Sequence, residues 1–146
     1  MSQNTTFTIY SEKPEIIIEE LLLDNLGNIP DDIKCFCFHG KLHFIQVDYD
    51  RFVNHGRAMY DVSWNKIPAE LHYPDLGKNI DKPENLNNII EVSESLSQGF
   101  DFVRVDLYNI NNKIYFGELT NYPGNGLEKF KPHIYDEKFG NLLNIG

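Results

Sequence analysis

Phe102-Val-Arg-Val-Asp-Leu-Tyr108 and Lys113-Ile-Tyr-Phe-Gly-Glu-Leu-Thr-Asn-Tyr-Pro-Gly124 are the two neighbouring stretches that decide the fold of this chain. Both are rich in β-branched and aromatic residues, and the first alternates apolar with polar side chains, as half-buried strands do. The Asn-rich residues between them are typical of a turn. The two stretches are therefore predicted to form a β-hairpin that runs into a Pro-Gly turn.

The predicted hairpin carries one carboxylate on each strand, Asp106 and Glu118. If residues 111–113 form a three-residue loop, the two carboxylates lie opposite each other on one face. A two-residue turn at 111–112 would instead send them to different faces. In the first register the polar residues on their face are Arg104, Tyr108 and Thr120, and the residues on the other face are Val103, Val105, Leu107, Tyr115 and Leu119. This separation of polar from mostly apolar residues favours the three-residue loop.

Two carboxylates that face each other on a sheet repel, so the pair is costly unless a cation lies between them. Asp106 and Glu118 are therefore a candidate metal site. The alternative is an ordinary half-solvated hairpin whose outward charges have no function. The pattern of these residues leaves both interpretations open.

Length and composition indicate one domain. The chain has 146 residues, of which 41% are hydrophobic and 13% aromatic, enough to form a substantial core. Its formal net charge of −9 argues against non-specific binding to nucleic acid or to an anionic membrane, since both need clustered Lys and Arg. The first residues lack the features of a signal peptide, and no apolar stretch approaches the roughly 20 residues that span a bilayer. We therefore expect a cytoplasmic chain without membrane insertion.

The cysteines and histidines give no sign of a metal or redox site. Cys35 and Cys37 lie two apart on one face of a predicted strand, where side chains are poorly placed to form a disulfide. They are interpreted as buried free thiols. The five histidines show no helical pair spacing for zinc and are interpreted as surface or core residues.

Further strands and irregular segments are predicted before residue 77. Residues 33–39 and 42–48 are expected to form a hairpin around Gly40-Lys41. The run 15–23 fits a strand or a short helix by pattern, and its β-branched residues favour a strand. A loop is expected from 24 to 31, and irregular structure from 50 to 76.

Two helices complete the predicted fold. Pro83 suits a first helical turn, and apolar residues then repeat at helical spacing until Gly99, which predicts a helix over about 83–98. A closing helix is expected within 132–143. The whole pattern predicts an α+β fold, a mainly antiparallel sheet with two or more packed helices.

The first hairpin resembles the metal-binding end of ATP-grasp ligases, in which an Arg-x-Asp strand is followed by Glu-x-Asn and a Pro-Gly turn. Here the match runs Arg104-Val-Asp106, then Glu118-Leu-Thr120, then Pro123-Gly124. Over most of its length the chain is similar to the TupA-like ATP-grasp proteins, named for a teichuronopeptide biosynthesis protein. The matching stretches are Pro14–Leu22, Asp32–Asp48, Arg51–Arg57, Trp64, Phe102–Tyr108 and Tyr115–Gly126.

This resemblance implies the C-terminal lobe of an ATP-grasp ligase, which uses ATP and Mg²⁺ to turn a carboxylate into an acylphosphate that an amine or similar nucleophile attacks. It implies that Asp106 and Glu118 bind Mg²⁺, a hard ion that usually takes one or two protein carboxylates plus phosphate oxygens. Thr120 stands where many ATP-grasp enzymes carry Asn and is a third candidate for the metal or its water. Arg104 is the candidate catalytic residue, placed to bind a phosphate or the acylphosphate. Its alternative role is a cross-strand salt bridge.

The resemblance also implies contacts with nucleotide and substrate. Glu19, Glu20 and Leu22 match the hinge strand that holds adenine, although the same run is equally typical of a core strand. Asp32 and Lys34 match the positions that offer an acidic group to ribose and a basic group to phosphate. Weaker candidates for substrate contact are Arg51, Arg57 and Gly124; surface arginines are more often solvated.

The match begins about one strand before the adenine hinge. Residues 1–146 are therefore expected to form a single partial ATP-grasp domain, without the N-terminal domain and the Gly-rich lobe that covers the phosphates. One function that follows is the C-terminal part of a carboxylate–amine ligase of cell-surface polysaccharide or teichuronopeptide biosynthesis. Its partners would be ATP, a carboxylate, an amine or glycan, and a separate chain that supplies the missing lobe. The other is a truncated, non-catalytic nucleotide-binding or interaction module.

Overall fold

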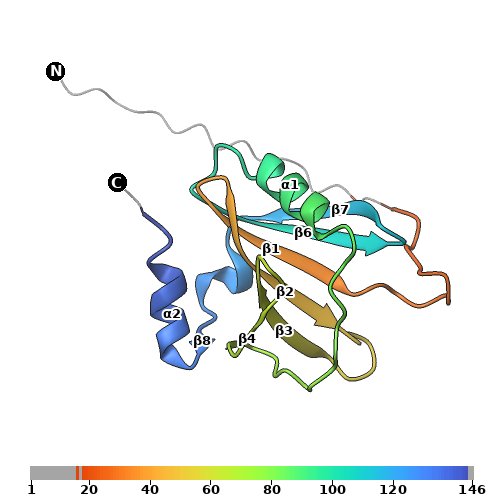
Figure 1. Cartoon of the computed structure of the whole chain (residues 1–146), viewed down its shortest axis with the longest axis horizontal. Helices are drawn as coiled ribbons and strands as arrows, with labels where there is room; N and C mark the ends of the chain where they lie inside the picture. Colours follow the sequence, from red (N-terminus) through yellow and green to blue (C-terminus); the bar gives the residue numbers. More distant parts are fainter. Residues whose placement is uncertain (1–15, 17, 145–146) are drawn as a thin grey trace.

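A computed structural model describes residues 16 and 18–144 of the chain (Figure 1). Its centre is a six-stranded antiparallel sheet with the order β4-β3-β2-β1-β6-β7. The strands of this sheet are β1 (Asp32–Phe38), β2 (Lys41–Tyr49), β3 (Gly56–Asp61), β4 (Lys66–Ile67), β6 (Phe102–Ile110) and β7 (Lys113–Thr120). The remaining elements are β5 (Glu70–Leu71), α1 (Leu86–Leu96), the 3₁₀ helix η1 (Pro123–Gly126), β8 (Phe130–Lys131) and α2 (His133–Gly140). The predicted α+β class, with a mainly antiparallel sheet and packed helices, is confirmed.

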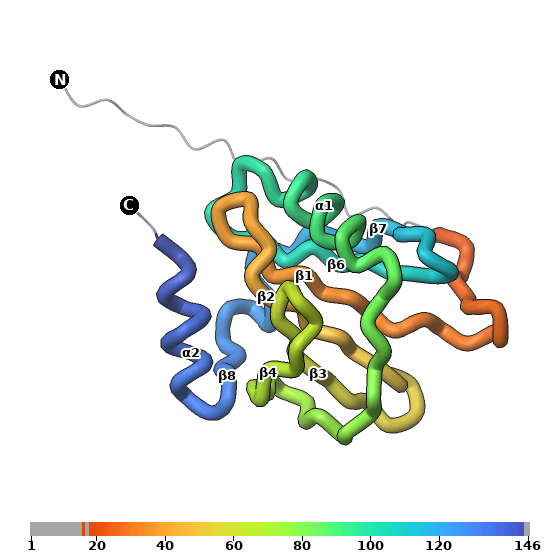
Figure 2. The backbone as a smooth tube through the Cα atoms, in the orientation of Figure 1, coloured from red at the N-terminus to blue at the C-terminus, as the bar shows by residue number. Residues whose placement is uncertain are grey.

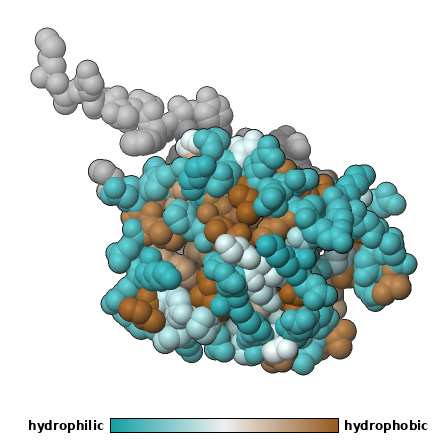
Figure 3. All heavy atoms as spheres, in the orientation of Figure 1, coloured by the Kyte–Doolittle hydropathy of each residue, from teal (hydrophilic) through white to brown (hydrophobic). Residues whose placement is uncertain are grey.

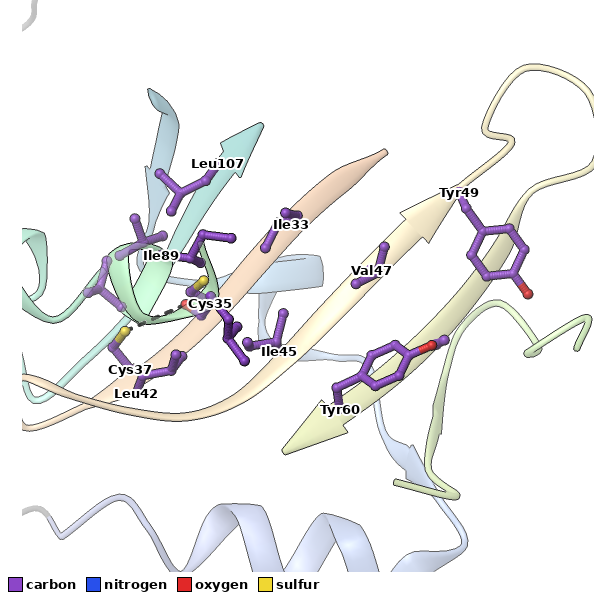
Figure 4. Close-up of a cluster of buried hydrophobic side chains, with 14 residues drawn as sticks. Ile33, Cys35, Cys37, Leu42, Ile45, Val47, Tyr49, Tyr60, Ile89 and Leu107 are labelled. Carbon is purple, nitrogen blue, oxygen red and sulfur yellow. Dashed lines mark hydrogen bonds between the residues drawn. The ribbon is translucent and has the colours of Figure 1, made fainter. Parts of the chain in front are cut away.

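One face of the sheet packs against α1. Alternate residues of β1, β2 and β6 point toward this helix, and Figure 4 shows Ile33, Ile45 and Leu107 around Ile89 of α1. The two cysteines lie in the same cluster as free, buried thiols, as predicted. Burial raises the pKa of both thiols. Seen from the side of α1, the molecule is covered mostly by hydrophilic residues with separate hydrophobic patches between them (Figure 3).

The opposite face of the sheet is aromatic at one end. Phe36, Phe38 and Phe44 lie there, and α2 and β8, which run side by side in Figure 2, pack against them. The ring of Phe44 stacks on Phe139 of α2 with centroids 4.0 Å apart. The second core therefore joins the C-terminal segment to strands that precede it by about a hundred residues in the sequence.

Both helices lie within their predicted ranges, and no helix among residues 16 and 18–144 is long and apolar enough to cross a membrane. The β1–β2 hairpin is also confirmed, although it turns at His39-Gly40 rather than at Gly40-Lys41. Both turn residues have positive φ, as a two-residue hairpin loop of type I′ requires.

Two predictions about secondary structure are wrong. The described residues of the run 15–23 form no strand, and Ile16 and Ile18 are each 91% exposed, because no other described strand pairs with them. The segment 50–76, expected to be irregular, contains β3 as well as the two-residue strands β4 and β5. β3 was not recognised from the sequence because its polar residue Arg57 is buried, which is unusual for arginine.

Candidate functional site

The β6–β7 hairpin brings Asp106 and Glu118 opposite each other, as predicted, by a different route. The turn contains only Asn111 and Asn112, both with positive φ, so the prediction of a three-residue loop is wrong. A β-bulge between Phe116 and Glu118 adds one residue to β7 and restores the expected pairing beyond it. Beyond the bulge Arg104 also pairs with Thr120.

The extra residue of the bulge is Gly117. A Cβ atom there would lie 3.0 Å from the carbonyl oxygen of Asp106, closer than an ordinary contact. Between the turn and the bulge the strands keep the register of a two-residue turn, so Tyr115 lies opposite Tyr108 and not on the apolar face where it was predicted. Glycine at this position therefore allows the two strands to approach where the two carboxylates meet.

The carboxylate pair belongs to a larger polar array on the face of the sheet away from α1. Lys34 is its centre, because it pairs with Gln46 of β2 on one side and with Asp106 of β6 on the other. The members of this polar array are Asp32, Lys34, Gln46, Asp48, Arg57, Arg104, Asp106, Glu118 and Thr120. Most of them are buried, so their charges must be paired within the protein.

Two cations hold the buried carboxylate of Asp106. Lys34 Nζ donates to Asp106 Oδ2 at 3.0 Å and also lies 3.3 Å from Asp32 Oδ2. Arg104 donates through Nε to Oδ1 and through Nη2 to Oδ2, both at 2.7 Å. Arg104 therefore forms a salt bridge along its own strand, and the cross-strand salt bridge considered for it is also present, to Glu118.

Glu118 and Thr120 extend the array to the edge of the sheet. Thr120 Oγ1 donates to Glu118 Oε1 at 3.1 Å and accepts a 3.3 Å hydrogen bond from Arg104 Nη2. The same Nη2 lies 3.5 Å from Glu118 Oε1, and the Glu118 side chain is 66% exposed. Arg104 therefore lies between the two carboxylates, and Glu118 is open to a ligand from solvent.

These oxygen donors suit Mg²⁺. Among the residues that the structure describes, no three His, Cys, Asp or Glu side chains gather into a cage that could hold a metal by protein atoms alone. Mg²⁺ does not need such a cage, because it is usually bound by one or two carboxylates together with water and phosphate oxygens. Asp106 and Glu118 supply two carboxylates and Thr120 a hydroxyl from the same pair of strands.

Asp32 lies in the same array and keeps one oxygen without a partner. Its Oδ2 contacts Lys34 and Nη1 of Arg51, whereas Oδ1 is buried and accepts no hydrogen bond from the protein. Burial, followed by the negative charge of Asp32, raises the pKa of Tyr108. The structure thus brings three predicted residues together: Asp32 and Lys34, which were predicted to contact the nucleotide, and Arg51, which was predicted to contact the substrate.

Arg57 forms its hydrogen bonds at the other end of the polar array, with Asp48 and the Leu71 carbonyl. Its guanidinium holds both oxygens of Asp48, with Nη2 to Oδ2 at 2.9 Å, and Nη1 donates to the Leu71 carbonyl at 2.7 Å. Burial alone would raise the pKa of Asp48, but the hydrogen bonds and the charge of Arg57 hold it below its ordinary value. This geometry gives Arg57 a structural role in joining β2 and β3 to β5, and its contact with substrate stays a prediction.

The remaining predicted residues lie outside the array. Glu19 and Glu20 are exposed and Leu22 is half-buried, in a segment without regular structure. No hydrogen bond or ion pair that the structure gives for residues 18–144 joins these three to the array. Gly124 lies in η1 with φ +56°, and a Cβ there would lie 2.4 Å from the Glu128 side chain, so a larger residue would be strained and would displace Glu128.

Sequence reasoning missed two members of the array, Gln46 and Asp48. The signal was present, because positions 44, 46 and 48 share one strand face and the last two are polar. Gln46 donates to Asp48 at 3.1 Å, and its own Oε1 is buried without a partner. Sequence reasoning also missed a cavity of about 230 Å³ between the sheet and α2, lined by Phe36, Phe102, Phe130 and Phe139 among others.

A larger cleft, of about 740 Å³, does not coincide with the carboxylate pair. It lies where β1 begins and β2 ends, between Trp64, Ile80 and the loops that carry Asp31 and Phe52. Burial raises the pKa of Asp31, and the charge of Lys78 partly offsets this effect. Asp48 of the array and Arg51, which contacts Asp32, also line this cleft. We place the candidate site at the polar array because the facing carboxylates and their cations meet there.

Comparison with known proteins gives one result. A family model described as TupA-like ATPgrasp matches residues 5–144. No curated protein and no solved structure matches the chain.

Proposed function

We propose, because the chain belongs to the TupA-like ATP-grasp family, that its polar array binds ATP with Mg²⁺ as the C-terminal part of a carboxylate–amine ligase in the cytoplasm. The substrate class expected from the family resemblance is a carboxylate and an amine or glycan of cell-surface polysaccharide or teichuronopeptide assembly. The observation that carries the proposal is the pairing of Asp106 with Glu118 next to Arg104 and Thr120.

In the proposed reaction, a substrate carboxylate oxygen attacks the γ-phosphorus of ATP. A new P–O bond forms, the bond to the β,γ-bridging oxygen breaks, and ADP leaves with the electron pair. The amine nitrogen then attacks the acyl carbon, so that a C–N bond forms, the C–O bond breaks and inorganic phosphate leaves; the amine proton passes to solvent. Bound Mg²⁺ would neutralise phosphate charge during the transfer. Arg104 would orient the transferred phosphoryl group, a role that suits its planar fork of donors.

The ion pairs of Asp106 imply that metal and nucleotide bind together. Lys34 and Arg104 now occupy both Asp106 oxygens, so Mg²⁺ alone must compete with two cations. Triphosphate offers these two side chains new anionic partners and leaves Asp106 available to the metal. We therefore expect weak binding of Mg²⁺ alone and much tighter binding of Mg²⁺ with ATP.

Isothermal titration calorimetry tests this assignment. We expect Mg²⁺-dependent binding of ATP to the wild-type chain, weakened at least tenfold by Asp106→Asn or by Glu118→Gln, since tenfold corresponds to about 1.4 kcal/mol and a ligand to the metal contributes more. Glu91→Gln is the matched control, because Glu91 is an exposed carboxylate on α1. Absence of metal-dependent binding at millimolar ATP, or equal binding by Glu118→Gln, would refute the site.

A non-catalytic module is the second candidate. It is favoured by the exposure of Glu118, because transfer of a phosphoryl group to a carboxylate needs a site that excludes water. The two functions differ in whether ADP is released when substrates are added. ATP binding without ADP release supports a module, or a chain that needs a separate partner to cover the phosphates; release by the chain alone supports a complete ligase.

A further inference from the structure

The cavity of about 230 Å³ lies beside the candidate catalytic residue on the same face of the sheet. Phe36, which lines the cavity, is the cross-strand partner of Arg104, and such partners have Cα atoms about 4.5 to 5.5 Å apart. Phe102, another lining residue, precedes Arg104 by two positions and so shares its face. Pro123, three residues after Thr120, lines the same cavity.

The walls of this cavity are almost entirely apolar. They come from three elements of the sheet face, from β8 and from α2, and most of the rings are buried. A closed, engineered apolar cavity of about 150 Å³ is large enough to bind benzene, and this pocket is larger but open to solvent on one side. This cavity therefore has room for a phenyl, indole or branched aliphatic group. A hydroxyl-rich sugar ring would lose hydrogen bonds to water there without replacement, a loss of roughly 1 to 3 kcal/mol for each hydroxyl.

Two acidic residues, Glu128 and Asp136, also line the cavity. Asp136 Oδ1 accepts a hydrogen bond from the backbone N–H of Phe130 at 3.0 Å, which fixes the carboxylate. Glu128 lies 3.7 Å from His72, and its side chain is partly exposed. A ligand with an ammonium group next to its apolar part would meet these carboxylates, while its own carboxylate would be directed along the sheet face toward Arg104, whose guanidinium now pairs with Asp106.

We propose that this cavity binds the side chain of an amino acid substrate that is aromatic or branched aliphatic, with the carboxylate directed toward Arg104. The inference rests on the proposed ligase function, and it makes an apolar amino acid, and not a uronic acid or a glycan, the substrate held next to the phosphates. Arg104 would thus separate two subsites on one sheet face, phosphate on the side of Asp106 and the apolar side chain on the side of Phe36.

The test is a titration of the ¹⁵N-labelled full chain, without nucleotide, with L-phenylalanine, L-leucine, L-glutamate and D-glucuronate. We expect saturable amide shifts around Phe102 and Phe130 with the first two ligands, and at least tenfold weaker binding of the last two. Gly140→Trp should weaken binding of phenylalanine at least tenfold by filling the cavity, because Gly140 lines it and an added Cβ meets no atom within 4 Å. Gly140→Ala is the matched control and should bind like wild type.

The inference is overturned if phenylalanine shows no saturable binding at tens of millimolar, if glucuronate binds as tightly, or if Gly140→Trp binds phenylalanine as wild type does. If circular dichroism shows that Gly140→Trp does not fold, Leu143→Trp replaces it in the test, because Leu143 lines the same cavity. Titration of the wild-type chain with both phenylalanine and Mg·ATP separates this inference from the proposed function. If the wild-type chain binds phenylalanine but not ATP, only the proposed function has failed. If it binds ATP but not phenylalanine, only this inference has failed.

Discussion

Replacement of Gly117 by alanine tests whether the bulge holds the two carboxylates in register. The new Cβ would lie 3.0 Å from the Asp106 carbonyl oxygen and 3.4 Å from Cε2 of Tyr108. The Tyr108 ring can rotate, but the Asp106 carbonyl belongs to β6, which is paired with β1 on one side and with β7 on the other. The backbone of the central sheet must therefore move by a few tenths of an ångström.

Such overpacking typically destabilises the fold by about 1 to 3 kcal/mol. The alanine variant has fewer unfolded conformations than the glycine chain, which offsets about 0.4 to 1 kcal/mol of this loss. We therefore expect Gly117→Ala to lower the free energy of unfolding by about 1 kcal/mol, which for a chain of this size lowers Tm by about 3 °C. Gly140→Ala makes the same chemical change at the end of α2, where nothing lies within 4 Å of the new Cβ. That variant should be unchanged or up to about 1 kcal/mol more stable.

Urea denaturation of the two variants and the wild type measures these changes directly. The same strain separates the backbones at Asp106 and Glu118, so Gly117→Ala should also weaken Mg·ATP binding, whereas Gly140→Ala should not. The reasoning is refuted if the two variants change stability equally, in sign and size. It is also refuted if Gly117→Ala loses stability while its ligand affinity remains that of wild type.

Two further predictions concern the Asp48–Arg57 pair. Arg57→Met leaves the buried Asp48 carboxylate without its main partner and should cost about 3 to 5 kcal/mol in urea denaturation. Arg51→Met should cost less than about 1 kcal/mol, because the Arg51 side chain is 42% exposed and its partner Asp32 keeps Lys34. Similar costs would contradict the structural role of Arg57. Because the folded pKa of Asp48 lies below the ordinary value of 3.8, its contribution to stability is fully present above that value and is lost as the pH falls through the folded pKa. Unfolding measured from pH 6 to pH 2 should therefore show a steep acid loss in wild type, and Asp48→Asn should flatten it; an unchanged slope would refute this.

Local patterns were enough to predict the elements that are stabilised by contacts close in sequence. The hairpin of residues 33–48 and both helices follow from alternation and from helical spacing, because each buries one face of a short segment. The facing of Asp106 and Glu118 was predicted from the separation of polar and apolar residues on the two faces of the hairpin, and the apolar residues of β6 do pack against α1. The turn was misjudged because a shorter loop and a bulge compensate each other, and Gly117 within a strand was the available sign.

Elements that depend on distant partners could not be predicted in this way. β3 was missed because Arg57 is polar yet buried, and its burial depends on Asp48 of another strand. The run 15–23 has the composition of a strand, but composition does not supply a neighbouring strand to pair with. The aromatic cavity forms only where Phe139 packs on Phe44, nearly a hundred positions away.

The change from aromatic to charged residues along one face of β1 is difficult to explain by stability. Phe36 faces the second core, and the next residue on that face, Lys34, is buried between two aspartates. Removal of such charges from water costs several kcal/mol for each ion, and their attraction at best offsets this loss; apolar residues of similar size would often leave the fold equally or more stable. The unpaired oxygens of Asp32 and Gln46 add to the cost, because each buried acceptor without a donor is unfavourable by roughly 1 to 3 kcal/mol. A protein that used this face only for packing would continue the phenylalanine surface to the end of the strand. A ligand with opposite charges would offset this cost, and in the proposed function a metal-bound triphosphate would supply anions for Lys34 and Arg104 and a cation for Asp106 and Glu118.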